Sequence, residues 1–342
     1  MARALGLANL LDHQVGGRRN LIINGAMKVA QRGTSISGGT GRDSYGLDRF
    51  VFEGTNYPIT AQVAHSNSQI TDGNRNALKI STAGTAGLGS AQVHQRIERE
   101  TFRHTIGQTV TFSCLVKRNS SNVTGGTLRM IASVNQNATY VFRDNPGTYP
   151  SHTVTETFVS GVQNIPTDYT RYTASFTMPA GANTTDILEI GVSFINFTGA
   201  GATEDLFSIT EMQLELGDTA TPFEHRSYGE ELALCQRYYQ KHATSSAATP
   251  MFTGLAMNAT TLRIPVTPYG GLMRDTPAIT LPGSQLARGN GTSTSITSVT
   301  YGNVTSYGYL FNFTTSGLTT HHIYYFVGTA GGGAALELDA EL

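Results

Sequence analysis

The stretch SITEMQLELGDTATPFEHRSYGEELALCQRYYQK, residues 208–241, decides the fold of this chain. Met212, Leu214 and Leu216 alternate with polar residues, which is the period of a β-strand with one buried face. Gly217 follows directly, and glycine readily adopts the backbone conformations of turns. The first part of the stretch therefore predicts a strand that stops at residue 217.

A connector and a helix follow this strand. A proline keeps the residue before it out of the α region, so Thr221, Pro222 and Phe223 should be extended. Ser227 and Glu230 have the spacing of a capping box, in which the two side chains bind backbone N–H groups at the start of a helix. The helix would carry one apolar stripe, formed by Leu232, Cys235 and Tyr239. We expect this to be the only substantial helix of the chain.

The composition favours an all-β protein. The chain has 342 residues, which suits two domains rather than one. Its 38 glycines, together with heavy use of Thr, Ser and Asn, are typical of short strands joined by many turns. We expect a jelly-roll β-sandwich, followed by one short helix and a second, smaller β domain.

Strand patterns recur between residues 20 and 217 and are separated by Gly, Asn and Pro. In the clearest one, Val110, Phe112 and Cys114 lie on one face of the strand. The predicted strands include residues 50–52, 77–80, 92–97, 109–116, 128–134, 170–178 and 187–194. About eight such strands suit a two-sheet sandwich, and we assign residues 20–226 to it.

The C-terminal part is a separate strand-rich region. Residues 241–250, KHATSSAATP, have the composition of a linker, and we assign the helix and linker to residues 227–250. Pro265 has no N–H group to donate to a neighbouring strand, which predicts that its strand lies at a sheet edge. The predicted strands of this second domain, residues 251–342, are 262–266, 278–281, 295–299, 307–313 and 323–327.

Charge, cysteine content and hydropathy exclude several classes of partner. The net charge of -1 gives no basic surface for nucleic acid or an anionic membrane, so we expect neither partner. Cys114 and Cys235 are too few for a disulfide framework or a zinc site. No stretch reaches the roughly 18 apolar residues of a membrane span. We expect a soluble protein, made in a cytoplasm and without a cofactor.

Several motifs, in a fixed order, resemble a known family. The matching segments are 20–33, 47–50, 167–179, 213–224 and 231–239. They are similar to the opening, a late strand and the end of a jelly-roll module found in many bacteriophage virion proteins, often tail fibres. Residues 265–280 also resemble the unit that often follows this module.

The resemblance implies a two-sheet sandwich similar to carbohydrate-binding modules and carried on a virus particle. The first hypothesis is therefore a virion protein, tail-fibre-like or a surface fibre, that contributes to host attachment. Related sugar-binding jelly rolls often hold a structural calcium through backbone carbonyls, which a sequence cannot show. We expect a homotrimer, because symmetric association would cover strand edges.

Two groups of residues are candidates for contacts outside the sandwich core. Loops at the rim of a sandwich carry binding more often than strands do, and the loop after residue 136 offers Tyr140, Phe142, Arg143 and Tyr149 as glycan contacts. Alternatively, this loop packs on its own sheet or on a neighbouring subunit. An N-terminal arm, residues 1–19, either frays or attaches to another virion protein or a sister subunit through Leu5, Leu7, Leu10 and Leu11.

A third group is a row of aromatic residues in the second domain. These side chains share one face of a predicted strand, as residues two apart do. They are Tyr307, Tyr309, Phe311 and Phe313. The row is either part of the core of this domain or a subunit interface.

The sequence shows no strong catalytic pattern, and we expect no enzyme. Glu98 and Glu100 would lie on one face of a strand, as paired carboxylates of a glycosidase might, but Arg96 and Arg99 beside them allow ordinary ion pairs. No repeat of 20 to 50 residues is present, which counts against the β-helix of many phage depolymerases. The alternatives to a fibre are an architectural head-decoration or connector protein, a glycan-binding module without fibre function and, least favoured, a polysaccharide hydrolase.

Overall fold

The computed structural model divides into two compact units, one that ends at Glu231 and one from Leu232 to Glu341. It describes residues 18–33, 35–38, 44–55, 59–62, 76–81, 87–135, 153–179, 187–199, 204–244, 249–269, 271, 273–282, 285–289, 292–305, 308–328 and 335–341. These residues form mainly antiparallel strands, which confirms the all-β prediction. Among them the longest helix is α3 (Tyr228–Gln236).

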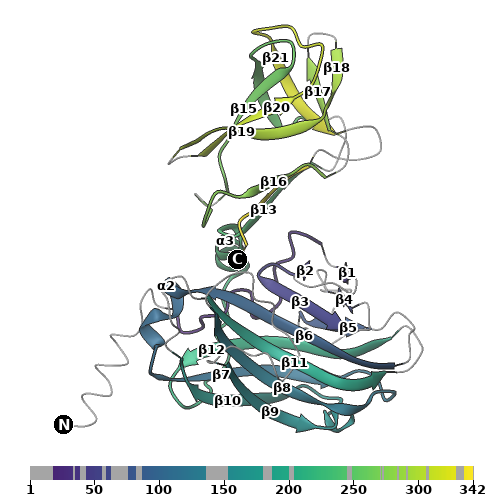
Figure 1. The fold of residues 1–342 in the computed structure, drawn as a ribbon, viewed down its shortest axis with the longest axis vertical. Coiled ribbons are helices and arrows are strands. Elements are labelled where there is room, and N and C mark those ends of the chain that lie inside the picture. Colours follow the sequence, from purple (N-terminus) through teal and green to yellow (C-terminus); the bar gives the residue numbers. More distant parts are fainter. Residues whose placement is uncertain are drawn as a thin grey trace, which may run out of the picture. The chain divides into compact units, whose positions relative to one another are not determined.

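The first unit is a sandwich of two antiparallel sheets (Figure 1). The larger sheet has the order β2 (Ser44–Tyr45), β3 (Phe50–Thr55), β6 (Gly87–Glu98), β11 (Ile187–Gly199), β8 (Thr124–Asn135) and β9 (Thr153–Ser160). The smaller sheet has the order β10 (Thr170–Thr177), β7 (Thr109–Arg118), β12 (Asp205–Leu216) and β5 (Leu78–Ser81). A separate pair is formed by β1 (Ser35–Gly38) and β4 (Ile59–Gln62), and the short helices are α2 (Arg99–Phe102), η1 (Arg103–Thr105) and η2 (Val162–Asn164).

One continuous apolar core fills the space between the two sheets. The inner faces contribute alternate residues of each strand, for example Val192 and Phe194 of β11 and Phe112 of β7, all fully buried. Phe194 of the larger sheet stacks on Phe207 of the smaller sheet, with ring centroids 4.2 Å apart. The predicted strands of this domain therefore pack as a two-layer sandwich.

Strand β12 differs from its predicted pattern because both of its faces are buried. Met212 and Leu214 belong to the core, as expected. Gln213 and Glu215, which alternation places on solvent, are 0% and 1% exposed. The carboxylate of Glu215 accepts hydrogen bonds from the backbone N–H and the hydroxyl of Thr221, and the amide of Gln213 donates to it at 2.8 Å. The prediction of one buried face is wrong for this strand, because the chain folds back over its outer face.

The segment that covers this outer face is the connector, defined here as residues 217–226. The hydroxyl of Thr111 donates to the carbonyl of Gly217 at 2.7 Å, and that of Ser175 donates to the carbonyl of Asp218 at 3.0 Å. The guanidinium of Arg171 donates to the carbonyl of Thr221 at 3.2 Å. Since these side chains come from β7 and β10, the connector covers the outer face of the smaller sheet and satisfies its polar groups.

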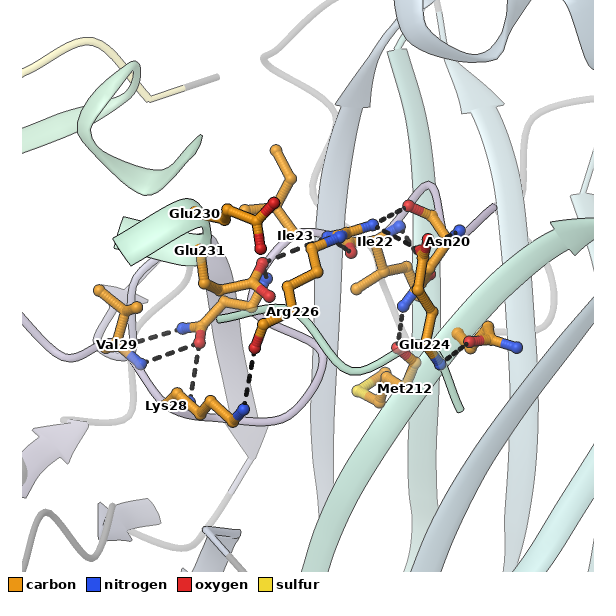
Figure 2. Close-up of polar contacts among 12 residues, drawn as sticks. Asn20, Ile22, Ile23, Lys28, Val29, Met212, Glu224, Arg226, Glu230 and Glu231 are labelled. Atoms are coloured by element: carbon orange, nitrogen blue, oxygen red, sulfur yellow. Dashed lines mark hydrogen bonds and ion pairs between the residues drawn. The ribbon is translucent and has the colours of Figure 1, made fainter. Parts of the chain in front are cut away.

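The connector ends in a buried group, the Arg226 network, which ties it to the start of the sandwich. Figure 2 shows the guanidinium of Arg226 between Glu231 on one side and Asn20 and Glu224 on the other. It also donates to the carbonyl of Ile22 at 3.1 Å. Burial alone would raise the pKa of Glu224, but the backbone N–H groups of Asn20 and Arg19 and the charge of Arg226 together lower it.

Asn20 extends this network into strand β12. Its side-chain amide donates to the carbonyl of Met212 at 3.1 Å and accepts from the backbone N–H of Leu214 at 3.0 Å. The network therefore joins two ends of the first unit that are about two hundred residues apart, since Arg226 and Asn20 differ by 206 positions.

The second unit contains a seven-stranded and a three-stranded sheet, both antiparallel. The larger has the order β18 (Thr292–Ile296), β17 (Gln285–Gly289), β21 (Ile323–Gly328), β14 (Phe252–Ala256), β15 (Thr261–Val266), β20 (Gly308–Thr314) and β19 (Ser298–Thr305). The smaller has the order β13 (Tyr239–Ala243), β22 (Ala335–Asp339) and β16 (Ala278–Thr280). Side chains of both sheets, such as Phe311 and Leu338, share a single core.

The capping box at the start of α3 is confirmed. The backbone N–H of Ser227 donates to the Glu230 carboxylate at 3.0 Å, and the backbone N–H of Glu230 donates to the Ser227 hydroxyl at 3.3 Å. The expected stripe is shorter than predicted, because α3 ends at Gln236 and Tyr239 begins β13. Residues 239–243 therefore pair with β22 as a strand, and three of them, 241–243, belong to the segment that composition assigned to a linker.

The prediction that Pro265 lies on an edge strand is wrong, although Pro265 itself is paired on one side only. Strand β15 lies inside the sheet, between β14 and β20. However, its pairing with β14 covers only Leu262 and Arg263, whereas Pro265 is paired only with Leu310 of β20. Pairing between β14 and β15 thus ends at Arg263, before Pro265, so the missing N–H of the proline removes no ladder bond to β14.

We predict that replacing Arg226 by Met destabilises the first unit strongly. The substitution leaves Glu231, 4% exposed, without the guanidinium that lies 3.3 Å away. Removing one partner of a buried ion pair typically costs about 3–5 kcal/mol. Native-state hydrogen exchange at the core amides of β11 measures this loss for the first unit alone.

The matched control is Arg103→Met, because the ion pair of Arg103 with Glu100 is exposed, with side chains 65% and 74% accessible. Such a pair contributes about 0–1 kcal/mol. Equal effects of the two substitutions would contradict a central role for the Arg226 network.

Candidate functional site

The residues that the sequence analysis proposed for contacts fall into two groups. Tyr140, Phe142, Arg143 and Tyr149 lie outside the described residues, as do Leu5, Leu7, Leu10, Leu11 and Tyr307. The other aromatic residues of the row, Tyr309, Phe311 and Phe313, are 0–4% exposed and belong to the core of the second unit. The rings of Tyr309 and Phe311 stack with centroids 5.8 Å apart, and Phe313 meets Phe311 edge to face at 6.2 Å.

The two glutamates considered for catalysis do not share a strand face. Strand β6 ends at Glu98, and Glu100 lies in helix α2. The carboxylate of Glu100 forms an exposed ion pair with Arg103 at 3.0 Å. In the part of the chain that the structure describes, no group of three or more His, Cys, Asp or Glu side chains could hold a metal ion, and no helix is long and apolar enough to cross a membrane.

The outer face of the larger sheet is the remaining broad face of the sandwich, since the connector covers that of the smaller sheet. Strand register places Gln92 of β6, Ser193 of β11 and Arg129 of β8 side by side across this face. We call these three residues the Ser193 row. Their neighbours in sequence, such as Val93 and Val192, point into the core, so the row points outward.

The Ser193 row combines burial with unused hydrogen-bonding capacity. Gln92 is 3% exposed, Ser193 is 0% exposed and Arg129 is partly buried. Among the described residues, Gln92 Oε1, Ser193 Oγ and Arg129 Nε have no hydrogen-bond partner. Buried polar atoms are normally paired with protein or ordered water, so three such atoms in one row are an exception among the described residues.

The adjacent row gives this face a neutral centre. His94 of β6 lies opposite Gly191 of β11, which in turn lies opposite Ile131 of β8. Burial, and to a smaller extent the charge of Arg96, lower the pKa of His94 to about 3, so the imidazole is neutral at pH 7. Because the folded pKa is below the unfolded value near 6.5, this contribution to stability is present above about pH 6.5 and is lost as the pH falls toward 3.

The next row contains a buried ion pair. The guanidinium of Arg96 donates to the carboxylate of Glu189 at 2.9 Å, and both side chains are 3% exposed. The carbonyl of Arg96 also accepts a hydrogen bond from Arg49. Three adjacent rows thus cross the outer face. The first holds the Arg96–Glu189 ion pair, the second holds neutral His94, and the third is the Ser193 row, whose polar atoms have no partner among the described residues.

Sequence patterns could not identify this site. The alternation in residues 92–97, 128–134 and 187–194 predicts all three strands correctly. However, the alignment of Gln92, Ser193 and Arg129 depends on the register between strands distant in sequence, which the patterns of the separate strands do not specify. The one available signal is the polar or small residue at alternate positions of strands that are otherwise apolar.

Comparison with known proteins gives similarity at the level of structure. No protein-family model matches the sequence, and no curated protein matches it. The enzymatically active domain of tailspike protein 4 from bacteriophage CBA120 aligns with a TM-score of 0.33 and 12% identity over 58% of this chain. The aligned part spans only 21% of that tailspike domain.

Carbohydrate-binding modules align at a similar level. A family 11 module from Clostridium thermocellum, in complex with a β-1,3-1,4-mixed-linked tetrasaccharide, has a TM-score of 0.29 and 12% identity, over 56% of this chain and 97% of the module. A module from the β-sandwich superfamily with promiscuous specificity has a TM-score of 0.33 and 14% identity, over 52% of this chain and 62% of that one. Identities and scores of this size carry no information on ligand or activity.

We predict that Gly191→Ala disrupts the outer face beside the Ser193 row. A Cβ atom at position 191 would lie 2.0 Å from the carbonyl oxygen of Val93 and 2.5 Å from the Cα of His94, so the two strands would have to separate. Overpacking of this kind typically costs about 1–3 kcal/mol or more. Thermal unfolding of the two variants Gly191→Ala and Gly229→Ala measures the effect.

Gly229 is the matched control, because it lies in α3 and a Cβ there meets nothing within 4 Å. Alanine should leave this helix unchanged or stabilise it by up to about 1 kcal/mol. A Gly191→Ala variant as stable as the Gly229→Ala variant would show that β6 and β11 are not registered as described.

Proposed function

We propose that the first unit binds a glycan on the outer face of its larger sheet. The observation that carries this proposal is the Ser193 row, where three buried polar atoms on neighbouring strands have no hydrogen-bond partner among the described residues. The connector occupies the opposite outer face, so a ligand of comparable size binds on the face of the larger sheet.

A hydroxyl-rich ligand matches the chemistry of this row. Gln92 Oε1 accepts a hydrogen bond, Arg129 Nε donates one and Ser193 Oγ does both. Each sugar hydroxyl also donates and accepts, so consecutive hydroxyl groups can satisfy all three atoms.

The direction of approach follows from the exposure of the row. Ser193 and Gln92 are buried, Arg129 is partly buried, and Thr157, which lies opposite Arg129 on edge strand β9, is exposed. A glycan that approaches from the β9 side therefore contacts Arg129 first. Catalysis is not part of this proposal.

We further propose that this glycan belongs to a bacterial host surface and that the protein is a fibre-like component of a phage particle, assembled as a homotrimer in the host cytoplasm. Support comes from the ordered sequence motifs of the jelly-roll module and from a second β unit after α3. The alternative is an architectural protein of the head or tail that binds no glycan. Light scattering of the purified protein, expected to give three times the chain mass, tests the oligomer.

We predict that Ser193→Ala weakens glycan binding without loss of stability. One hydroxyl–ligand hydrogen bond contributes about 0.5–1.5 kcal/mol, so the Kd should rise roughly two- to tenfold. The unliganded variant should be as stable as the parent, because the buried hydroxyl loses no partner among the described residues. An array of bacterial polysaccharides identifies the ligand, and titration calorimetry then measures its Kd.

Ser175→Ala is the control, because Ser175 lies on the other outer face, where its hydroxyl donates to the connector at 3.0 Å. This variant should keep full affinity. Absence of binding to every polysaccharide, or equal affinities of the two variants, would favour the architectural alternative.

A further inference from the structure

We propose that Gln240, His242 and Tyr269 form an acid-sensitive latch in the second unit, in which a proton on His242 releases Tyr269 from strand β13. We call these three residues the Tyr269 latch. All of them belong to the second unit, so the latch does not depend on whether the first unit binds a glycan.

The side chain of Gln240 holds the backbone of Tyr269. The N–H of Tyr269 donates to Gln240 Oε1 at 2.8 Å, and its carbonyl accepts from Gln240 Nε2 at 2.9 Å. The same Nε2 donates to the carbonyl of Gln236, the last residue of α3, at 2.9 Å. Gln240 is 0% exposed. One buried carboxamide therefore joins the segment that follows β15 to both β13 and α3.

The ring of Tyr269 covers His242. Gln240 and His242 are two residues apart in β13, so their side chains lie on the same face of that strand. The rings of Tyr269 and His242 stack, with centroids 4.3 Å apart and planes inclined by 26°. Tyr269 is 51% exposed, whereas His242 is only 2% exposed. The exposed ring thus separates the imidazole from solvent.

The other described neighbours of His242 on this face are apolar. The ring of Phe252 lies with its centroid 5.5 Å from that of His242. Strand register places His242 opposite Leu336 of β22, which belongs to the core of the second unit. Tyr269 is the titratable side chain that the structure shows against the imidazole. Neither Phe252 nor Leu336 can stabilise a proton on His242.

The charged pair of the same two strands lies on their other face. Lys241 and Glu337 are joined at 3.0 Å, and each is one position from His242 or Leu336, so both point away from the imidazole. Burial is the cause that lowers the pKa of His242 to about 4. The covered imidazole is therefore neutral at pH 7.

Opening of the latch and protonation of His242 favour each other. The pKa of His242 is about 4 when covered and returns toward the usual 6.5 when Tyr269 leaves. Because the covered pKa is the lower one, this contribution to the closed state is present above about pH 6.5 and is lost as the pH falls toward 4. Between pH 7 and pH 5 the equilibrium constant for opening should rise roughly twentyfold.

Hydrogen exchange of the full chain, resolved to single amides, tests the latch. After correction for the intrinsic pH dependence of exchange, protection of the Tyr269 amide should fall roughly twentyfold from pH 7 to pH 5. The control is the amide of Thr315 in the same unit, which donates to the carbonyl of Thr260 at 2.9 Å and should keep its protection. Titration of His242 by NMR should give a pKa near 4.

Three variants separate titration from packing. His242→Phe keeps an aromatic ring under Tyr269 but cannot bind a proton, so the extra pH dependence of the Tyr269 amide should vanish. Tyr269→Ala uncovers the imidazole and should raise the pKa of His242 toward 6.5. Tyr269→Leu keeps an apolar cover and should leave this pKa low. Circular dichroism of each variant verifies folding.

Two results would overturn the latch. One is equal pH dependence of the Tyr269 and Thr315 amides, or a fall in Tyr269 protection that persists in His242→Phe. The other is titration of His242 near pH 6.5 or above in the parent protein, which is expected if stacking on Tyr269 stabilises the imidazolium more than burial disfavours it.

Discussion

The contact between the connector and the outer face of the smaller sheet is the constraint on which the rest of the first unit depends. Glu215 is 1% exposed on this face, and a buried carboxylate is tolerated only where hydrogen bonds and an opposite charge stabilise it. Thr221, Gln213 and Arg19 supply these, with the Arg19 guanidinium 3.2 Å away. The connector can lie nowhere else without leaving this charge uncompensated.

The outer faces of the two sheets differ in how their buried polar groups are paired. On the smaller sheet the polar groups of Thr111, Ser175 and Arg171 are satisfied by carbonyl groups of the connector. On the larger sheet Gln92 and Ser193 are equally buried, yet their side-chain oxygens are unpaired among the described residues. The polar groups of one face are thus paired with the connector, whereas those of the other have no partner among the described residues, which is why the ligand proposal concerns the larger sheet.

The sequence predicted local features well and long-range ones poorly, for a physical reason. Period-two alternation and the Ser227–Glu230 capping box depend on neighbouring residues, and both are present in the structure. The burial of Glu215 and the interior position of β15 depend instead on which segments pair or fold back, and these predictions failed. The Ser193 row belongs to the second kind, because its residues meet only through strand register.

Hydrogen exchange of the full chain with and without a saturating oligosaccharide ligand tests the central claim most directly. The account predicts added protection in residues 124–135 and 187–195, the strand segments that carry Arg129 and Ser193, and no change in the connector. Protection confined to residues 217–226 or to the second unit, with none at β8 and β11, would contradict it.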